Sequence, residues 1–254
     1  MLYRIALIGA FSLSACSLLI AAACKDGGDD GQANPSSSAA PETLEEQLAS
    51  ILLKDEEVPQ ELEAGALEYS TNEQVAGPSQ EELDRLNGLG RQLGVDLTFV
   101  PVADVPADSP ARGGIQNSAS VYLDPEGASQ AFKTRSEAAR TNDWPANYQD
   151  LDDVQTAEVA SGVGDESYWL RITGLDQCEA AEATPGPSPA PTCPPPRMAV
   201  IDHLLFRSGR TFIYLMVVSD TPTGVEDDAF AAQVRDWAMT VGGRAVQTFP
   251  PAQG

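Results

Sequence analysis

Two strongly apolar runs follow each other closely in RMAVIDHLLFRSGRTFIYLMVVSD, from Arg197 to Asp220. Both are rich in the β-branched and aromatic residues that favour strands. Ser208 and Gly209 separate them, and glycine adopts positive φ without a Cβ clash. Because a two-residue loop matches the twist of antiparallel strands, the stretch predicts a β-hairpin with its loop at Ser208-Gly209.

Both faces of this hairpin are apolar. Side chains alternate between the two faces of a strand, so one face is expected to carry Ile201, Leu205, Phe212, Tyr214 and Met216. The other face is expected to carry Val200, Leu204, Phe206, Ile213, Leu215 and Val217. A strand pair that is apolar on both sides requires cover on both sides. The hairpin therefore predicts a three-layer molecule with the sheet in the middle.

Helices that can supply this cover are marked by caps and by apolar stripes. Capping boxes, with a hydroxyl residue three positions before Glu, begin at Thr43, Ser79 and Thr223. Asp124-Pro125 is a further helix start. These signals predict helices over 43–54, 79–94, 125–141 and 223–240, and strands at 66–70, 95–102, 115–123, 154–160 and 167–173. The order predicts an α+β fold, an antiparallel sheet covered by helices in an α-β-α sandwich.

The N-terminal segment MLYRIALIGAFSLSACSLLIAAAC has one charge, at Arg4, followed by 19 uncharged residues and small residues before a cysteine. This pattern is typical of a cleaved export signal. It resembles the signal of bacterial lipoproteins, in which the cysteine at the cut site is acylated. Cys24 is the preferred lipidation site, because cleavage there leaves a polar tether, and Cys16 in Leu-Ser-Ala-Cys is the alternative. An ordinary cleaved signal peptide and an uncleaved anchor helix are the other interpretations.

These patterns divide the chain into parts. Residues 1–23 are the expected lipoprotein signal peptide, and 24–42, rich in Gly, Ser and Asp, are a flexible tether. Residues 43–248 are expected to form a single α+β domain, with 249–254 as a tail. The expected location is the extracytoplasmic face of the cell membrane, held by the lipid anchor.

Charge restricts the partners of the folded part. The chain has 15 Lys+Arg against 38 Asp+Glu, a net charge of -23. Such a field repels nucleic acid and anionic lipid head groups. It favours a soluble monomer. Separately, we expect the partner to be a small molecule or an envelope protein.

Two cysteines, Cys178 and Cys193, enclose 14 residues of a Pro-rich loop over 175–196. In an exported protein this spacing predicts a disulfide. Closing a loop of that length contributes about 3 kcal/mol. A redox pair is the alternative, but the C-x-x-C spacing is missing.

No residue stands out as catalytic. His203 is the sole histidine, and its neighbour Asp202 points to the opposite face of the strand. We expect His203 to be a hydrogen-bonded sheet residue that faces Tyr214 across the hairpin. The sequence also lacks a nucleophile elbow and the spacing of a metal site, so we expect no catalytic residue, no metal and no cofactor.

Aromatic side chains are the best candidates for ligand contact. Trp144 and Tyr148 lie in a polar loop, and Tyr168 and Trp169 lie in a strand. The four could line a groove. The alternative, which the sequence favours, is core packing, with Trp144 and Tyr148 over the sheet edge. Alternation along the strand places Tyr168 with Leu170 and Ile172, and Trp169 on the other face with Arg171.

Four segments together resemble PsbP-like domains, which occur in exported bacterial lipoproteins and in mycobacterial kinase sensor domains. They are SVYLDPEGASQAF (120–132), GVGDES (162–167), LLFRSGRTFIYLMVV (204–218) and the final helix. The resemblance implies an α-β-α sandwich that binds or scaffolds without catalysis. We therefore expect a membrane-anchored, non-catalytic ligand- or partner-binding module, sensor-like in kind. An envelope hydrolase that uses acidic residues and a purely structural envelope protein are the alternatives.

Overall fold

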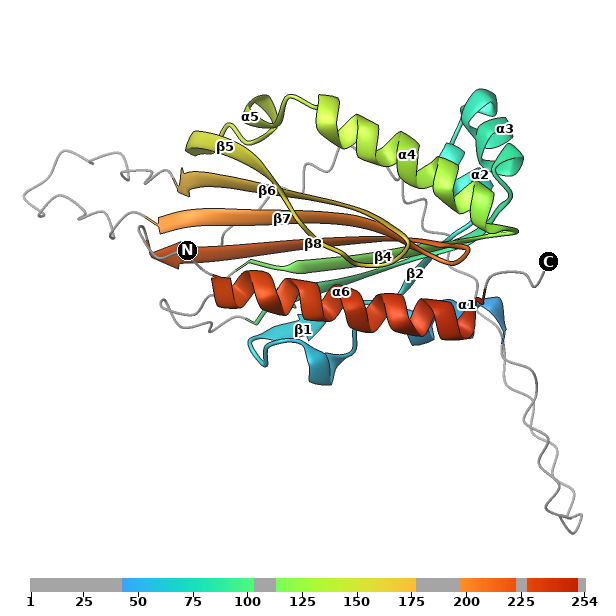
Figure 1. The fold of residues 1–254 in the computed structure, drawn as a ribbon, viewed down its shortest axis with the longest axis horizontal. Helices are drawn as coiled ribbons and strands as arrows, with labels where there is room; N and C mark the ends of the chain where they lie inside the picture. Colours follow the sequence, from blue (N-terminus) through green and yellow to red (C-terminus); the bar gives the residue numbers. More distant parts are fainter. Residues whose placement is uncertain (1–42, 103–112, 177–196, 223–227, 251–254) are drawn as a thin grey trace, which may run out of the picture.

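The structure is a computed structural model that describes residues 43–102, 113–176, 197–222 and 228–250 (Figure 1). The expected lipidation sites Cys16 and Cys24, the cysteine pair Cys178 and Cys193, and the capping box at Thr223 lie outside the described residues. Among the described helices, none combines the length and the apolar character that crossing a membrane would demand.

An eight-stranded sheet, antiparallel at every pairing, forms the middle of the described molecule. The strand order is β1-β3-β4-β8-β7-β6-β5, and β2 also pairs with β3. The strands are β1 (Leu62–Ala64), β2 (Glu68–Ser70), β3 (Arg91–Pro101), β4 (Ile115–Tyr122), β5 (Leu151–Val159), β6 (Glu166–Asp176), β7 (Arg197–Ser208) and β8 (Thr211–Pro222).

Helices cover both faces of this sheet, which confirms the α+β class (Figure 1). One layer holds α1 (Leu44–Ile51) and α6 (Asp228–Thr248), and the other holds α4 (Pro125–Thr141) and the short α5 (Trp144–Asn147). A 3-10 turn at Asp55–Glu57, α2 (Asn72–Ala76) and α3 (Gln80–Gly88) complete the helical elements of the described residues.

The predicted hairpin is β7–β8, and it lies inside the sheet between β6 and β4. Its two faces are covered as the alternation predicts. Leu204, Phe206, Ile213, Leu215 and Val217 pack with α1 and α6 in one core cluster. Ile201, Leu205, Phe212, Tyr214 and Met216 pack in a second cluster below α4 and α5.

The loop of the hairpin differs by one residue from the prediction. Ser208 pairs with Thr211, so the loop is Gly209-Arg210. Gly209 has φ +60°, and positive φ at the first loop position is the geometry of a type II′ turn. The shift moves the register by two residues, which leaves every side chain on its predicted face.

The second predicted helix is shorter than expected. α3 ends at Gly88, and Gly90 with φ +69° turns the chain into β3, which begins at Arg91. A glycine with positive φ just past the helix is a common stop. At the N-terminus Ser79 accepts from the Glu82 amide as predicted, but the Glu82 carboxylate binds Arg85 instead of completing the box.

The last helix is longer than expected and extends the core. Phe230, Val234, Trp237 and Val241 pack in the α1–α6 cluster as their spacing predicts. The helix continues to Thr248, and Phe249 is fully buried in the same cluster. The tail predicted over 249–254 therefore does not include Phe249, because its ring is part of the core.

Candidate functional site

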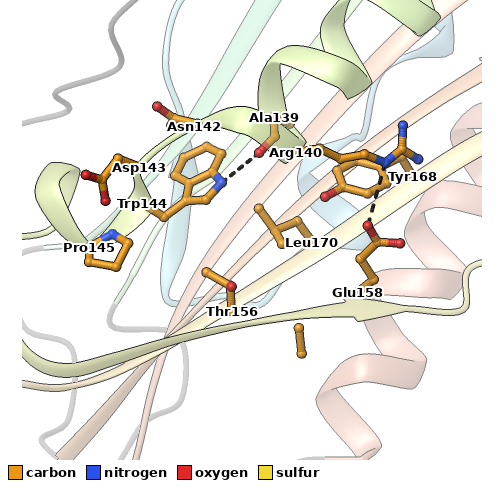
Figure 2. A pocket seen from close by; sticks show the side chains of 11 residues that line it. Ala139, Arg140, Asn142, Asp143, Trp144, Pro145, Thr156, Glu158, Tyr168 and Leu170 are labelled. Carbon is orange, nitrogen blue, oxygen red and sulfur yellow. Dashed lines mark hydrogen bonds and ion pairs between the residues drawn. The ribbon is translucent and has the colours of Figure 1, made fainter.

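A cavity of about 310 Å³, the α5 cleft, lies between the end of α4, α5 and strands β5 and β6 (Figure 2). Its residues come from both helices, from the turn between them, and from the outermost described strands on that side of the sheet. They are Ala139, Arg140, Asn142, Asp143, Trp144, Pro145, Thr156, Ala157, Glu158, Tyr168 and Leu170.

Local sequence builds the helical wall of the α5 cleft. Asp124 caps α4 through the Gly127 amide at 2.8 Å, and Pro125 supplies the first helical φ. After α4 ends, Asp143 caps α5 through the Ala146 amide. The predicted polar loop thus contains one short helix, which turns Trp144 back toward α4.

Trp144 is fixed from two sides. Its indole Nε1 donates to the Ala139 carbonyl at 2.8 Å, and its ring centroid lies 4.7 Å from that of His203. Tyr148 stacks beside it with ring centroids 6.2 Å apart. The indole is therefore a rigid wall of the α5 cleft.

Below this wall, a chain of hydrogen bonds runs through His203. The imidazole Nε2 is 3.2 Å from the Tyr148 hydroxyl, and Nδ1 is 2.7 Å from the Tyr214 hydroxyl. A neutral imidazole donates through one nitrogen and accepts through the other, so both ring nitrogens are satisfied. This confirms His203 as a hydrogen-bonded sheet residue that contacts Tyr214, although its backbone pairs with Met216.

Burial sets the protonation states of this chain. It lowers the pKa of His203 to about 4 and raises the pKa of Tyr148 to about 12. Burial raises the pKa of the Tyr214 hydroxyl as well. Desolvation disfavours the charged form of each group. At neutral pH the imidazole and both phenols are therefore uncharged.

At the other end of the α5 cleft, Arg140 lies over an aromatic ring. The guanidinium carbon is 4.3 Å from the centre of the Tyr168 ring, and Nε is 3.6 Å from a carboxylate oxygen of Glu158. Figure 2 shows the three side chains gathered at this end. Burial and the Glu158 carboxylate both raise the pKa of Tyr168.

The structure brings together three of the four aromatic residues singled out from the sequence. Trp144 and Tyr168 line the α5 cleft, and Tyr148 packs in the cluster beneath it. Trp169 is buried on the opposite face of the sheet, in the α1–α6 cluster. There its indole Nε1 donates to Asp202 at 2.7 Å. Trp169 therefore cannot contact a ligand in this cleft.

Sequence reasoning missed the polar residues of the site, Arg140, Glu158 and Thr156. A signal for two of them exists in the strand pairing. Thr156 pairs with Ile172 and Glu158 with Leu170, so both side chains lie on the face of β6 that carries Tyr168. Finding them from the sequence requires the register of β5, which contains a bulge between Asp152 and Gln155.

Other candidate sites in the described parts are weaker. A cavity of about 240 Å³ lies near Gly174, and it is lined by Asp153, Gln155, Thr173, Gly174, Leu175 and Met198. Within the described residues, no group of three or more His, Cys, Asp or Glu is placed to hold a metal ion.

No protein family model matches the chain, and no curated protein matches it. Among solved structures, it is similar to the extracellular domain of PknH from Mycobacterium tuberculosis. The two share 10% sequence identity at a TM-score of 0.45, over 80% of this chain and 97% of that chain.

Proposed function

We propose that the domain is a non-catalytic module that binds a small molecule in the α5 cleft. The observation that carries this proposal is the composition of the cleft. A rigid indole, a tyrosine ring and a few polar groups surround about 310 Å³. Small-molecule sites are concave, partly aromatic and furnished with a few placed polar groups.

The sole histidine and its neighbouring aspartate are engaged in structural contacts. His203 is bonded through both ring nitrogens, and its pKa of about 4 leaves it a weak base. Asp202 lies on the other face of the sheet, where Arg171 holds both its oxygens at 2.9 Å. These engagements favour binding over hydrolysis.

We also propose that the module is displayed outside the cytoplasm on a lipid anchor at Cys24. The apolar N-terminal run that ends in small residues before this cysteine supports the proposal. A diacylated cysteine holds a protein stably at a membrane, because two chains are enough where one is marginal. Replacing both Cys16 and Cys24 by Ser is expected to abolish the lipid mass and to release the protein from the membrane fraction. Retention of the double variant in that fraction without loss of lipid mass would refute the anchor.

The binding proposal is tested by filling the cleft. Thr156→Tyr places a phenol inside the α5 cleft from an exposed strand position, and tyrosine is favoured in strands. Gln155→Tyr makes the matching change on the same strand, where residue 155 lines the smaller cavity near Gly174 and not the α5 cleft, so the pair of variants also shows which cavity holds the molecule. Full-length protein purified from its own host would be studied by native mass spectrometry. We expect a co-purified small molecule on the wild type and on Gln155→Tyr, and its loss from Thr156→Tyr.

Two results would overturn the proposal. One is a wild-type protein that carries no small molecule and shows no shift on incubation with an extract of host metabolites. The other is a bound molecule that Thr156→Tyr retains as fully as Gln155→Tyr does. Conversion of an added envelope glycan or peptide by the wild type would instead favour the hydrolase alternative.

A further inference from the structure

We infer that the α5 cleft selects an organic cation, and that Arg140 occupies the position which the ligand's cationic group takes. This inference rests on the proposed binding function. It names the class of ligand: a compact molecule with a guanidinium or alkylammonium group on a short apolar body. Arg140 is then an intramolecular competitor that the ligand displaces.

Arg140 lies in a position that suits a bound cation. Its guanidinium lies over the face of Tyr168 and beside the carboxylate of Glu158, at the distances given above. An aromatic face attracts a cation through its quadrupole, and this is how quaternary ammonium and methylated lysine ligands are recognised. The side chain of Arg140 thus marks a cation subsite within the cleft.

Arg140 is held only weakly in this position. The side chains of Arg140 and Glu158 are 43% and 64% exposed. An ion pair that is this exposed to water contributes about 0–1 kcal/mol to stability. Tyr168, by contrast, is 4% exposed and fixed in β6. The subsite therefore stays in place when Arg140 rotates away into solvent.

Arg207, elsewhere in the described chain, is an arginine that is held firmly by its partners. Arg207 binds Glu166, Asp165 and the Gly209 carbonyl together, at 2.6 to 2.9 Å. Its side chain is only 14% exposed. Compared with Arg207, Arg140 has a longer ion pair and a more exposed side chain. Both differences are consistent with a side chain that a ligand displaces.

The other charged groups of the cleft also favour a cationic ligand. Asp143 lies at the end occupied by Trp144, so two carboxylates and one arginine line the cleft. Displacement of Arg140 leaves the carboxylates uncompensated unless the ligand is cationic. The net charge of -23 adds a field that attracts cations and opposes anions. Ala139 and Leu170 supply an apolar surface for the body of the ligand.

Butylguanidinium and its neutral analogue butylurea test the inference directly by isothermal titration calorimetry on the full chain. We expect butylguanidinium to bind and butylurea to bind at least about tenfold more weakly. Arg140→Gln should tighten butylguanidinium binding up to about fivefold, because it removes the competitor. Glu158→Gln should weaken it, and Lys133→Gln, which removes an exposed charge from the same helix, should leave it unchanged.

A capped Gly-Arg-Gly peptide separates the two sources of the same chemistry. Binding of butylguanidinium but not of the peptide identifies a free small cation. Equal binding of both identifies a basic side chain of a protein partner, and the shared chemistry stands in either case.

The inference and the proposed function fail separately. Equal affinity for butylurea, or no gain in Arg140→Gln while its circular dichroism is unchanged, overturns the cation inference. A neutral or anionic host molecule that Thr156→Tyr expels would also overturn it, yet would leave the binding function intact. Absence of any host molecule together with no binding of either probe overturns both.

Discussion

His203 is a titratable side chain that the fold keeps neutral, and this predicts a pH dependence of stability. Its ordinary pKa of 6.5 falls to about 4 because it is buried. Between these two pH values the imidazole is protonated in the unfolded chain but neutral in the folded chain. The contribution of His203 is therefore complete above about pH 6.5 and is lost as the pH falls toward 4, by about 3 kcal/mol in total.

Chemical denaturation at pH 7 and at pH 4.5 measures this loss. Gln in place of His203 still donates and accepts hydrogen bonds but does not titrate in this range. We expect His203→Gln to lose about 2 kcal/mol less than the wild type between the two pH values. An equal loss in both proteins would show that other groups cause the pH dependence.

Asp202 and Arg171 form a largely buried ion pair, whereas the pair of Arg140 and Glu158 is exposed. The carboxylate is fully buried and also accepts from Trp169. Asp202→Ala is expected to cost about 3 kcal/mol or more, because the removal of one member leaves the other without its charge partner.

A double-mutant cycle with Arg171→Ala should give a coupling above about 1 kcal/mol. The same cycle at Arg140 and Glu158 should give under about 1 kcal/mol. Similar couplings at the two pairs would contradict the difference in burial.

At the scale of single residues, the sequence predicted which face of a strand a side chain lies on better than it predicted which residues that side chain contacts. Alternation placed His203 and Asp202 on opposite faces, and Tyr168 and Trp169 likewise, because the period of a strand is fixed at two. It could not predict that Arg140 reaches Tyr168, because that contact joins a helix end to a strand 28 positions later. Such contacts depend on how the layers pack, which no local pattern contains.

Adjacent glycines in α6 give a matched test of helix packing. A Cβ on Gly243 meets nothing within 4 Å, whereas a Cβ on Gly242 lies 3.1 Å from the Ser208 hydroxyl and 3.2 Å from the Phe206 ring. Alanine is favoured over glycine in a helix by about 1 kcal/mol. Gly243→Ala should therefore raise the melting temperature. Gly242→Ala should lower it, since Ser208 and Phe206 are buried and overpacking costs about 1–3 kcal/mol.

Calorimetric melting of the two variants distinguishes this packing from a looser one. A gain in stability for both would mean that α6 does not approach the hairpin turn closely at residue 242. A loss for both would mean that glycine is required at residue 243 for another reason.

Elements with strong signals were predicted well, but the end of a helix was predicted correctly for α4 and not for α3. Asp124 and Pro125 defined the start of α4, and its predicted end at Thr141 is confirmed. The leucine spacing of 79–94 fits a helix throughout, yet Gly90 divides it into α3 and a strand. Glycine at that position permits both a continuing helix and a stop, and the sheet decides between them because β3 pairs from Arg91 onward.

At the scale of the whole molecule, three layers could be predicted because the hairpin is apolar on both faces. The short elements could not: β1, α2 and α5 are three to five residues long. Elements of that length have too few residues to show a period. α5 is one of them, and it forms a wall of the cleft. The fold was therefore accessible from the sequence, and the site largely was not.

Neighbouring leucines of β7 test the layered arrangement itself. Leu204 is fully buried in the cluster with α1 and α6, and Leu205 is 6% exposed in the cluster on the α4 side. Truncation of a buried leucine to alanine costs about 2–5 kcal/mol, from lost transfer energy and the cavity left behind. In a three-layer molecule both Leu204→Ala and Leu205→Ala carry a cost of this size.

The two losses should also add in the double variant, because the side chains belong to separate clusters on opposite faces. Urea denaturation of the three variants gives the free energies of unfolding. A cost under about 1 kcal/mol at either position would mean that water, and not a helix layer, covers that face of the hairpin.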